Sequence, residues 1–199
     1  MKASRSLASH AFAKRRLVRS SYFRAVRWQA QLPDGALAMD LTWITGRIAV
    51  GGGIWNADNM AAVARAGVTH ILDMQVEFDD TQLAVPCNIV VLWNPVDDDF
   101  QPKPPEVFQR GVDFALDALD QDGTKLFVHC AAGVHRAPMM ALALLCSLSW
   151  SLEEAQRLIE AKRPVVDFAD VYVESVKRFL AQKPEAGIRT SAAGRRLAH

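Results

Sequence analysis

The sequence of 199 residues predicts a single α/β domain, in which helices flank a mixed, mostly parallel central sheet. Short apolar runs alternate with amphipathic helical segments along the middle of the chain, which is typical of α/β folds. Half of the residues are hydrophobic, enough for one buried core at this length. Basic residues concentrate at the N-terminus, outside an acidic body. The expected division is a basic N-terminal arm (residues 1–36), a folded domain (residues 37–182) and a flexible tail (residues 183–199).

The arm is defined by its charge. Residues 1–33 carry eight basic side chains and no acidic one, whereas residues 34–181 carry 11 basic and 21 acidic residues. Val18, Tyr22 and Val26 recur at helical spacing, which favours a short amphipathic helix. Three interpretations stay open: a solvated arm, which is the default, an arm bound to anionic lipid, nucleic acid or the chain's own acidic body, and an organelle transit peptide.

Five strands and five helices are expected in the folded domain. The strands cover residues 42–45, 47–50, 68–74, 88–93 and 125–130, and the helices cover residues 56–66, 106–120, 137–150, 151–163 and 167–180. Asn56 or Asp58 can cap the first helix, and Ser151 with Glu154 forms a capping box for the fourth. The strand over residues 88–93 is nearly all apolar, which indicates a parallel strand covered on both faces.

The strand that ends at His129 leads into the most informative segment, which reads H-C-x-x-G-x-x-R from His129 to Arg136. A loop of small residues between a strand and a helix N-terminus presents backbone N–H groups to an anion. Gly133 permits the tight turn, and Arg136 offers a planar pair of donors for phosphate oxygens. Cys130 lies at the base of this loop, where the thiolate is favoured and is nucleophilic. A buried structural cysteine is the weaker alternative.

This segment resembles the H-C-x(5)-R signature of cysteine-dependent phosphatases, and residues 41–180 are similar to the dual-specificity branch, including its atypical members. The resemblance implies that Cys130 accepts the phosphoryl group and that Arg136 binds its oxygens. The backbone from Ala131 through Ala132, Gly133 and Val134 to His135 would cradle the phosphate, with His129 in support. The imidazole of His135 itself is expected to be solvated. Where the family carries a hydroxyl residue after the arginine, this chain has Ala137, which implies slower breakdown of a phosphoenzyme.

A second expected part of the site is the loop over residues 94–105, which is rich in proline and contains Asp97, Asp98 and Asp99. Breaking a P–O bond requires a proton for the leaving oxygen, and an aspartate over the site can supply it. The resemblance assigns this role to Asp98, with Asp97 and Asp99 kept as alternatives.

The expected function is therefore metal-independent hydrolysis of a phosphate monoester, without a cofactor, by a protein-tyrosine or dual-specificity phosphatase. A phosphate-binding pseudophosphatase, favoured by Ala137, and a rhodanese-like sulfurtransferase are the alternatives. A phosphoprotein is the expected substrate, although sugar and lipid phosphates stay open. The loop from Ala131 to His135 contains no lysine, which argues against a lipid phosphate as the substrate.

The remaining expectations concern location and partners. Cys87, Cys130 and Cys146 are too scattered for a zinc site or a disulfide framework, which favours a reducing compartment. The cytoplasm is expected, with an organelle as the alternative. No apolar run is long enough for a transmembrane segment. Residues 1–33 can contact an anionic surface or nucleic acid, and the oligomeric state is left open.

Overall fold

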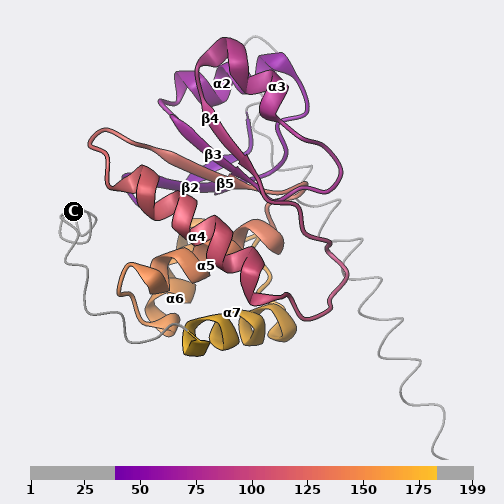
Figure 1. The fold of residues 1–199 in the computed structure, drawn as a ribbon, viewed down its shortest axis with the longest axis vertical. Coiled ribbons are helices and arrows are strands. Elements are labelled where there is room, and N and C mark those ends of the chain that lie inside the picture. Colours follow the sequence, from indigo (N-terminus) through magenta and orange to yellow (C-terminus); the bar gives the residue numbers. More distant parts are fainter. Residues whose placement is uncertain (1–38, 183–199) are drawn as a thin grey trace, which may run out of the picture.

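A computed structural model describes residues 39–182 of the chain (Figure 1). The predicted basic arm with its helical segment and the predicted C-terminal tail lie outside the described residues. The predicted α/β domain with a mixed, mostly parallel sheet is confirmed for the described part. Within it, no helix has the length and apolar character needed to cross a membrane.

The sheet contains five strands in the order β1-β2-β5-β3-β4. These are β1 (Leu41–Trp43), β2 (Ile48–Gly51), β3 (His70–Asp73), β4 (Val90–Trp93) and β5 (Leu126–His129). Only the pairing of β1 with β2 is antiparallel. His129, the last residue of the central strand β5, is level with Gly51 of β2 and Asp73 of β3. The loops that follow β2, β3 and β5 therefore begin side by side at the C-terminal ends of these strands, where ligands commonly bind in open α/β sheets.

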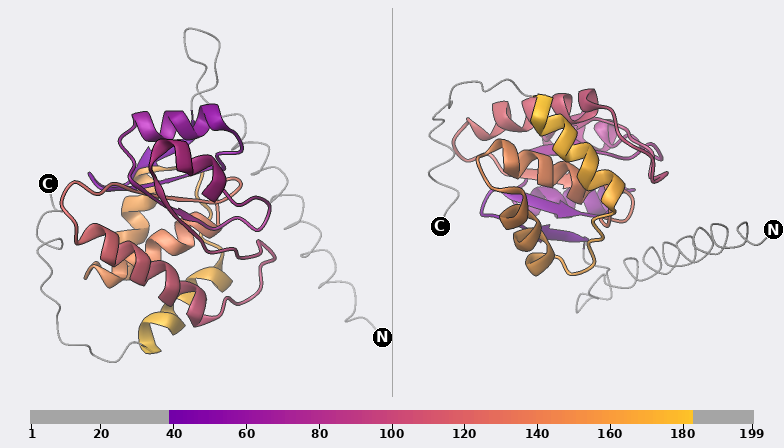
Figure 2. Two further views of the ribbon diagram at one scale, coloured as in Figure 1. Left: turned by 45° about the horizontal axis from the view of Figure 1, so that its top comes forward. Right: turned by 90° about the horizontal axis from the view of Figure 1, so that it is seen from below.

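Helices cover both faces of the sheet (Figures 1 and 2). One face carries α4 (Pro105–Leu119), α5 (Arg136–Ser147), α6 (Leu152–Lys162) and α7 (Asp170–Gln182), and the other carries α2 (Ala57–Arg65) and α3 (Thr81–Ala84). A 3₁₀ turn, η1 (Val85–Cys87), follows α3. Residues of the central strands alternate between the two cores: Val128 packs with the α5 side, and its neighbour Phe127 packs with the α2 side. This alternation follows from the two-residue period of a strand.

The predicted helix caps are present. The Asn56 side chain accepts a hydrogen bond from the backbone N–H of Asn59 at 2.9 Å, and Ser151 and Glu154 form both halves of the capping box. The helix α5 is buried along its first ten residues, as a core helix should be, although it begins at Arg136 rather than after it. The sequence did not predict α3 and η1, whose few residues give too short a pattern to recognise.

The expectation that the strand over residues 88–93 is covered on both faces is wrong. The strand β4 lies at the edge of the sheet, and Val90 and Trp93 are 52% and 41% exposed. The strand also begins two residues later than predicted, because Asn88 adopts a left-handed conformation at the end of η1. An apolar composition alone does not distinguish an edge strand from an interior one.

Candidate active site

The loop between β5 and α5 holds Cys130 at its base. The Cys130 side chain is buried, and its Sγ accepts a hydrogen bond from the Gly133 N–H at 3.3 Å. Gly133 has a φ of +63°, and a Cβ atom there would lie 2.6 Å from the carbonyl oxygen of Gly51. Both the conformation and the close contact require glycine. The loop is therefore held tightly around the sulfur, with the N-terminus of α5 beside it.

Arg163, at the C-terminal end of α6, supports this loop from outside. Its Nε donates a hydrogen bond to the Gly133 carbonyl at 2.8 Å. Its Nη1 and Nη2 donate to the two carboxylate oxygens of Asp40 at 2.7 and 2.6 Å, and Nη1 also reaches the Thr42 hydroxyl at 3.0 Å. The buried guanidinium thus joins the loop to the segment that contains β1. Sequence reasoning missed this residue, since an arginine before a proline carries no distinctive local signal.

Arg136 is the first residue of α5, and its guanidinium is fixed by a second acid that the sequence analysis did not identify. Its Nη1 and Nη2 donate to the two carboxylate oxygens of Glu77 at 2.9 and 2.8 Å. Nη1 also donates to the Val96 carbonyl at 3.2 Å. Partial burial acts to raise the pKa of Glu77, but the hydrogen bonds and charge of Arg136 outweigh it and lower that pKa. Among the described residues, Nε donates no hydrogen bond, which leaves it available to a phosphate oxygen.

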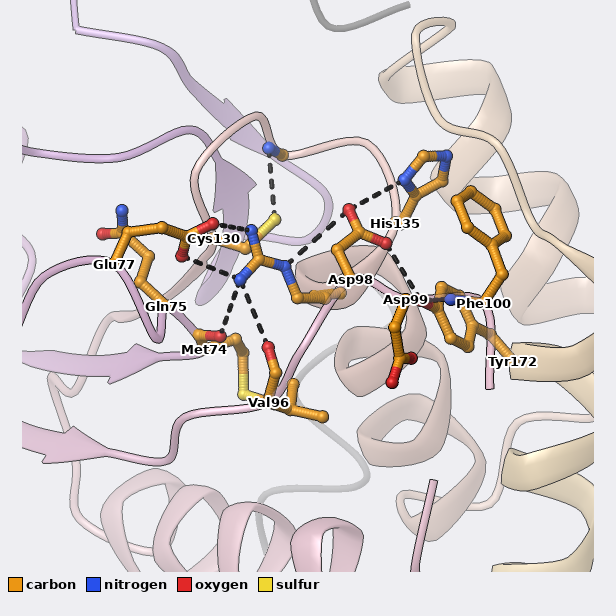
Figure 3. A network of polar contacts seen from close by, with 12 residues as sticks. Met74, Gln75, Glu77, Val96, Asp98, Asp99, Phe100, Cys130, His135 and Tyr172 are labelled. Carbon is orange, nitrogen blue, oxygen red and sulfur yellow. Dashed lines mark hydrogen bonds and ion pairs between the residues drawn. The ribbon is translucent and has the colours of Figure 1, made fainter. Parts of the chain in front are cut away.

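The loop that precedes α4 brings one of its three aspartates to the site. Figure 3 shows Cys130 between Glu77 on one side and Asp98 on the other. The Asp98 carboxylate lies 3.8 Å from the Arg136 Nε and accepts a hydrogen bond from the Tyr172 hydroxyl at 2.9 Å. Asp97 is exposed, and Asp99 pairs with Lys103. The geometry thus favours Asp98 over its neighbours, as expected, while its role in catalysis stays a prediction.

His135 is the N-cap residue of α5, and the expectation that its imidazole is solvated is wrong. The residue is 5% exposed, and its Nδ1 lies 3.0 Å from the Asp98 carboxylate. Burial acts to lower the pKa of His135, but the hydrogen bond and charge of Asp98, together with Asp167, raise it above the ordinary value. The Phe100 ring, in the loop before α4, packs against the imidazole with 5.1 Å between the two ring centroids. The burial depends on this loop, which sequence spacing alone could not place.

The same contacts decide the charge of Asp98. Its burial acts to raise the pKa, but the hydrogen bond and charge of His135, with smaller effects of Arg136 and Tyr172, lower it below the usual range. Asp98 is therefore a carboxylate near neutral pH in the free protein. A bound phosphate dianion would oppose this shift, because a neighbouring negative charge favours the protonated acid.

His129 contacts two further acids beneath the loop. Its Nε2 lies 2.9 Å from Asp80 and 3.6 Å from Asp73, and all three side chains are fully buried. Burial raises the pKa of Asp73 to about 6. In the described part of the chain, these three residues are the one group whose ligand atoms lie close enough together to hold a metal ion. The Gln75 N–H also donates to Asp73 at 2.8 Å, and the contacts of His129 with Asp73 and Asp80 join the end of β5 to the segment that follows β3.

The fold and the loop between β5 and α5 define an α/β domain with a buried, free cysteine at the base of its candidate site. The catalytic-domain model of the dual specificity phosphatases matches residues 54–181. The chain belongs to this family. Rat dual specificity protein phosphatase 5 is 30% identical over 116 residues, and mouse laforin is 26% identical over 137 residues. These matches cover 58% and 59% of this chain but only 29% and 41% of the relatives, so the chain spans less than half of their length.

Solved structures agree on the fold. The crystal structure of PTPMT1 matches with a TM-score of 0.62 at 22% identity, covering 70% of this chain and 92% of that one. The structure of Tk-PTP in the active form matches with a TM-score of 0.63 at 21% identity, covering 72% of this chain and 98% of that one. At these identities the comparison establishes the architecture only.

Proposed function

We propose that the protein hydrolyses phosphate monoesters through a covalent cysteinyl-phosphate, with a phosphoprotein as substrate. The observation that carries the proposal is the convergence of three groups: the Cys130 thiol, the Arg136 guanidinium and the Asp98 carboxylate. Cys130 and Arg136 flank the loop between β5 and α5, and Asp98 lies in the loop before α4. Together they provide a nucleophile, a positive charge for the phosphate oxygens and an acid for the leaving group.

In the first step, the Cys130 thiolate attacks phosphorus while the bond between phosphorus and the ester oxygen breaks. Protonated Asp98 gives its proton to that oxygen, so an alcohol or phenol leaves. The Arg136 Nε and the N–H groups from Ala131 to His135 hold the equatorial oxygens, whose charge they stabilise. The substrate's own negative charge assists by raising the pKa of Asp98 toward the protonated form.

In the second step, water attacks the cysteinyl-phosphate and the S–P bond breaks. Asp98, now a carboxylate, takes a proton from that water, and Cys130 leaves as a thiolate. Phosphate and the free protein result. The Gly133 N–H, 3.3 Å from the sulfur, favours the departing thiolate. No side-chain hydroxyl of the described residues donates to this sulfur, and Ala137 stands where the family carries one.

The test is release of phenol and phosphate from aryl phosphates and phosphopeptides. Cys130→Ser should abolish turnover, whereas Cys87→Ser, a matched change at a cysteine outside the site, should not. Asp98→Asn should lower turnover of alkyl phosphates by about 10²–10⁴-fold, the usual range for general acid catalysis. Esters of acidic phenols should lose less because their leaving groups need less protonation. Equal effects of Asp97→Asn or Asp99→Asn would show that the acid is assigned to the wrong residue.

Ala137 also supports a second candidate, a pseudophosphatase that binds phosphate esters without turning them over. Binding of a phosphopeptide with no product release over hours would favour it. Phosphate release that disappears with Cys130→Ser would exclude it, and turnover of thiosulfate instead of phosphate esters would indicate a sulfurtransferase.

We also propose that the protein acts in a reducing compartment, with the cytoplasm as the first choice. All three cysteines are free in the structure, and the Cys130 thiol must stay reduced to act as a nucleophile. Cell fractionation with an antibody against the folded domain tests this, and recovery from an organelle lumen would contradict it.

A further inference from the structure

Tyr172, in the first turn of α7, contacts the loop that carries Asp98. The residue is 1% exposed. Its hydroxyl donates a hydrogen bond to the Asp98 Oδ1 at 2.9 Å and accepts one from the Phe100 N–H at 3.0 Å. Figure 3 shows Asp98 between Cys130 on one side and Tyr172 with Phe100 on the other. The last helix of the described residues thus contacts the proposed acid directly.

Further contacts hold the loop against α7. The Phe100 ring stacks on the Tyr172 ring with 5.7 Å between centroids, and the Lys103 Nζ lies 5.5 Å from the Tyr172 centroid. The Lys103 N–H donates to the Ser175 hydroxyl at 3.0 Å. Phe100 itself has a φ of +58°, a left-handed conformation that a bulky residue rarely adopts. Strained residues of this kind concentrate at functional sites, where the surrounding contacts maintain them.

The two carboxylate oxygens of Asp98 have different surroundings. Oδ1 accepts the hydrogen bond from the Tyr172 hydroxyl, whereas Oδ2 lies 3.0 Å from the His135 Nδ1 and 3.8 Å from the Arg136 Nε. Among the described residues, this Nε donates no hydrogen bond, and the proposed mechanism assigns it to a phosphate oxygen. Oδ2 is therefore the oxygen of Asp98 that faces the proposed phosphate.

The direction of the Tyr172 hydrogen bond is fixed by its partners. A phenol hydroxyl has a single hydrogen, and the oxygen of this one already accepts the Phe100 N–H. Burial and the charge of Asp98 raise the pKa of Tyr172 above its ordinary value, so the hydroxyl keeps its hydrogen. The charged groups around the phenol are Asp98, Asp99 and Lys103. A proton on Oδ1 would displace the hydrogen bond from Tyr172, whereas a proton on Oδ2 would leave it in place.

We propose that Tyr172 is a positioning residue, which occupies Oδ1 of Asp98 so that the acid proton is carried on Oδ2. The inference rests on the proposed phosphatase function. In the first step, the Oδ2–H of Asp98 gives its proton to the ester oxygen as the P–O bond breaks, and Asp98 becomes a carboxylate. In the second step, the same Oδ2 takes a proton from the attacking water. Tyr172 neither gives nor takes a proton in either step.

The test is Tyr172→Phe, which keeps the ring beside Phe100 and removes only the hydroxyl. Ser175→Ala is the matched control, because it removes another contact between α7 and the same loop without a contact to Asp98. Both changes are also made in the Asp98→Asn background. We measure kcat/KM against pH for an alkyl phosphate and for aryl phosphates with phenols of graded acidity, together with competitive inhibition by inorganic phosphate.

We expect Tyr172→Phe to lose about tenfold in kcat/KM for the alkyl phosphate, a part of the roughly 10²–10⁴-fold that general acid catalysis supplies. The loss should shrink as the leaving phenol becomes more acidic, and the inhibition constant of inorganic phosphate should not change. The hydrogen bond from Tyr172 helps to lower the pKa of Asp98, so its removal should move the basic limb of the profile to higher pH. Ser175→Ala should show neither the dependence on the leaving group nor the shift.

The Asp98→Asn background separates positioning from support of the loop. There, Tyr172→Phe should have no further effect, because it acts through the Asp98 proton. Equal losses for all esters, or the same loss in the Asp98→Asn background, would overturn the inference. A wild type that turns over no ester would instead contradict the proposed function itself, and the role of Tyr172 with it.

Discussion

The Asp98 carboxylate and the His135 imidazole lie 3.0 Å apart, and each belongs to a different part of the site. Asp98 comes from the loop before α4, and His135 is the N-cap residue of α5, at the end of the loop from Cys130 to His135 (the phosphate loop). The pair thus connects the proposed acid to the loop that would hold the phosphate. Phe100 and Tyr172 stack at 5.7 Å beside it, and the Phe100 N–H donates to the Tyr172 hydroxyl at 3.0 Å.

This pair makes the pH dependence of turnover a test of His135. Asp98 acts as an acid only when it is protonated, so activity falls as pH rises through its pKa in the free protein. His135 helps to lower that pKa. His135→Gln should therefore raise it and move the basic limb of the kcat/KM profile to higher pH. His70→Gln, at a partly buried histidine on β3, is the control, and an unmoved basic limb in His135→Gln would contradict the argument.

A second prediction concerns Asp73, whose pKa burial raises to about 6. A carboxyl with a raised pKa in the folded state favours folding below its unfolded pKa, and that contribution is lost as pH rises through the folded value. Asp73→Asn cannot ionise and keeps an oxygen for the Gln75 N–H. It should stabilise the protein at pH 7.5 by up to about 3 kcal/mol and by nothing near pH 3.

Urea unfolding of wild type and Asp73→Asn at several pH values measures this difference. Asp58→Asn, a change on the exposed first turn of α2, serves as the control. A variant that is less stable at pH 7.5 would mean that the charge of Asp73 beside His129 contributes more than its desolvation costs.

Ala137 gives a prediction about the order of steps. A hydrogen bond from a hydroxyl to a charged sulfur is worth roughly 1.5–3 kcal/mol, and about 1.4 kcal/mol corresponds to a tenfold change in rate. Without it, breakdown of the cysteinyl-phosphate should be about tenfold slower, and an aryl phosphate should show a burst of phenol release. Ala137→Ser should shrink the burst and raise kcat. A wild type without a burst, with a serine variant no faster, would show that another step limits turnover.

The basic arm should act through its charge alone. Deletion of residues 1–33 should leave hydrolysis of a small aryl phosphate nearly unchanged, because the site is built from residues of the folded domain. Any binding to anionic vesicles or to nucleic acid should disappear with the deletion and weaken steeply with salt. Binding that persists in the deleted protein would place the contact on the folded domain instead.

Much of the fold followed from local patterns, because each pattern depends on neighbours in the sequence. The Ser151 capping box and the strand that leads to Cys130 are examples. The family resemblance assigned the acid's role to Asp98, and its carboxylate lies beside His135 in the structure. Glu77, Arg163 and the burial of His135 could not be predicted in this way, since each depends on a contact between distant segments. The edge position of β4 was missed for the same reason, because strand order is a property of the whole sheet.

The contact of Arg163 with Asp40 joins residues that are 123 positions apart in the sequence. Closing so long a segment is entropically costly and slow compared with forming a helix or pairing adjacent strands. The phosphate loop therefore receives its outer support only when both ends of the domain have come together. Because the phosphate site forms last, we expect the helical circular dichroism signal to recover during refolding before the affinity for inorganic phosphate does.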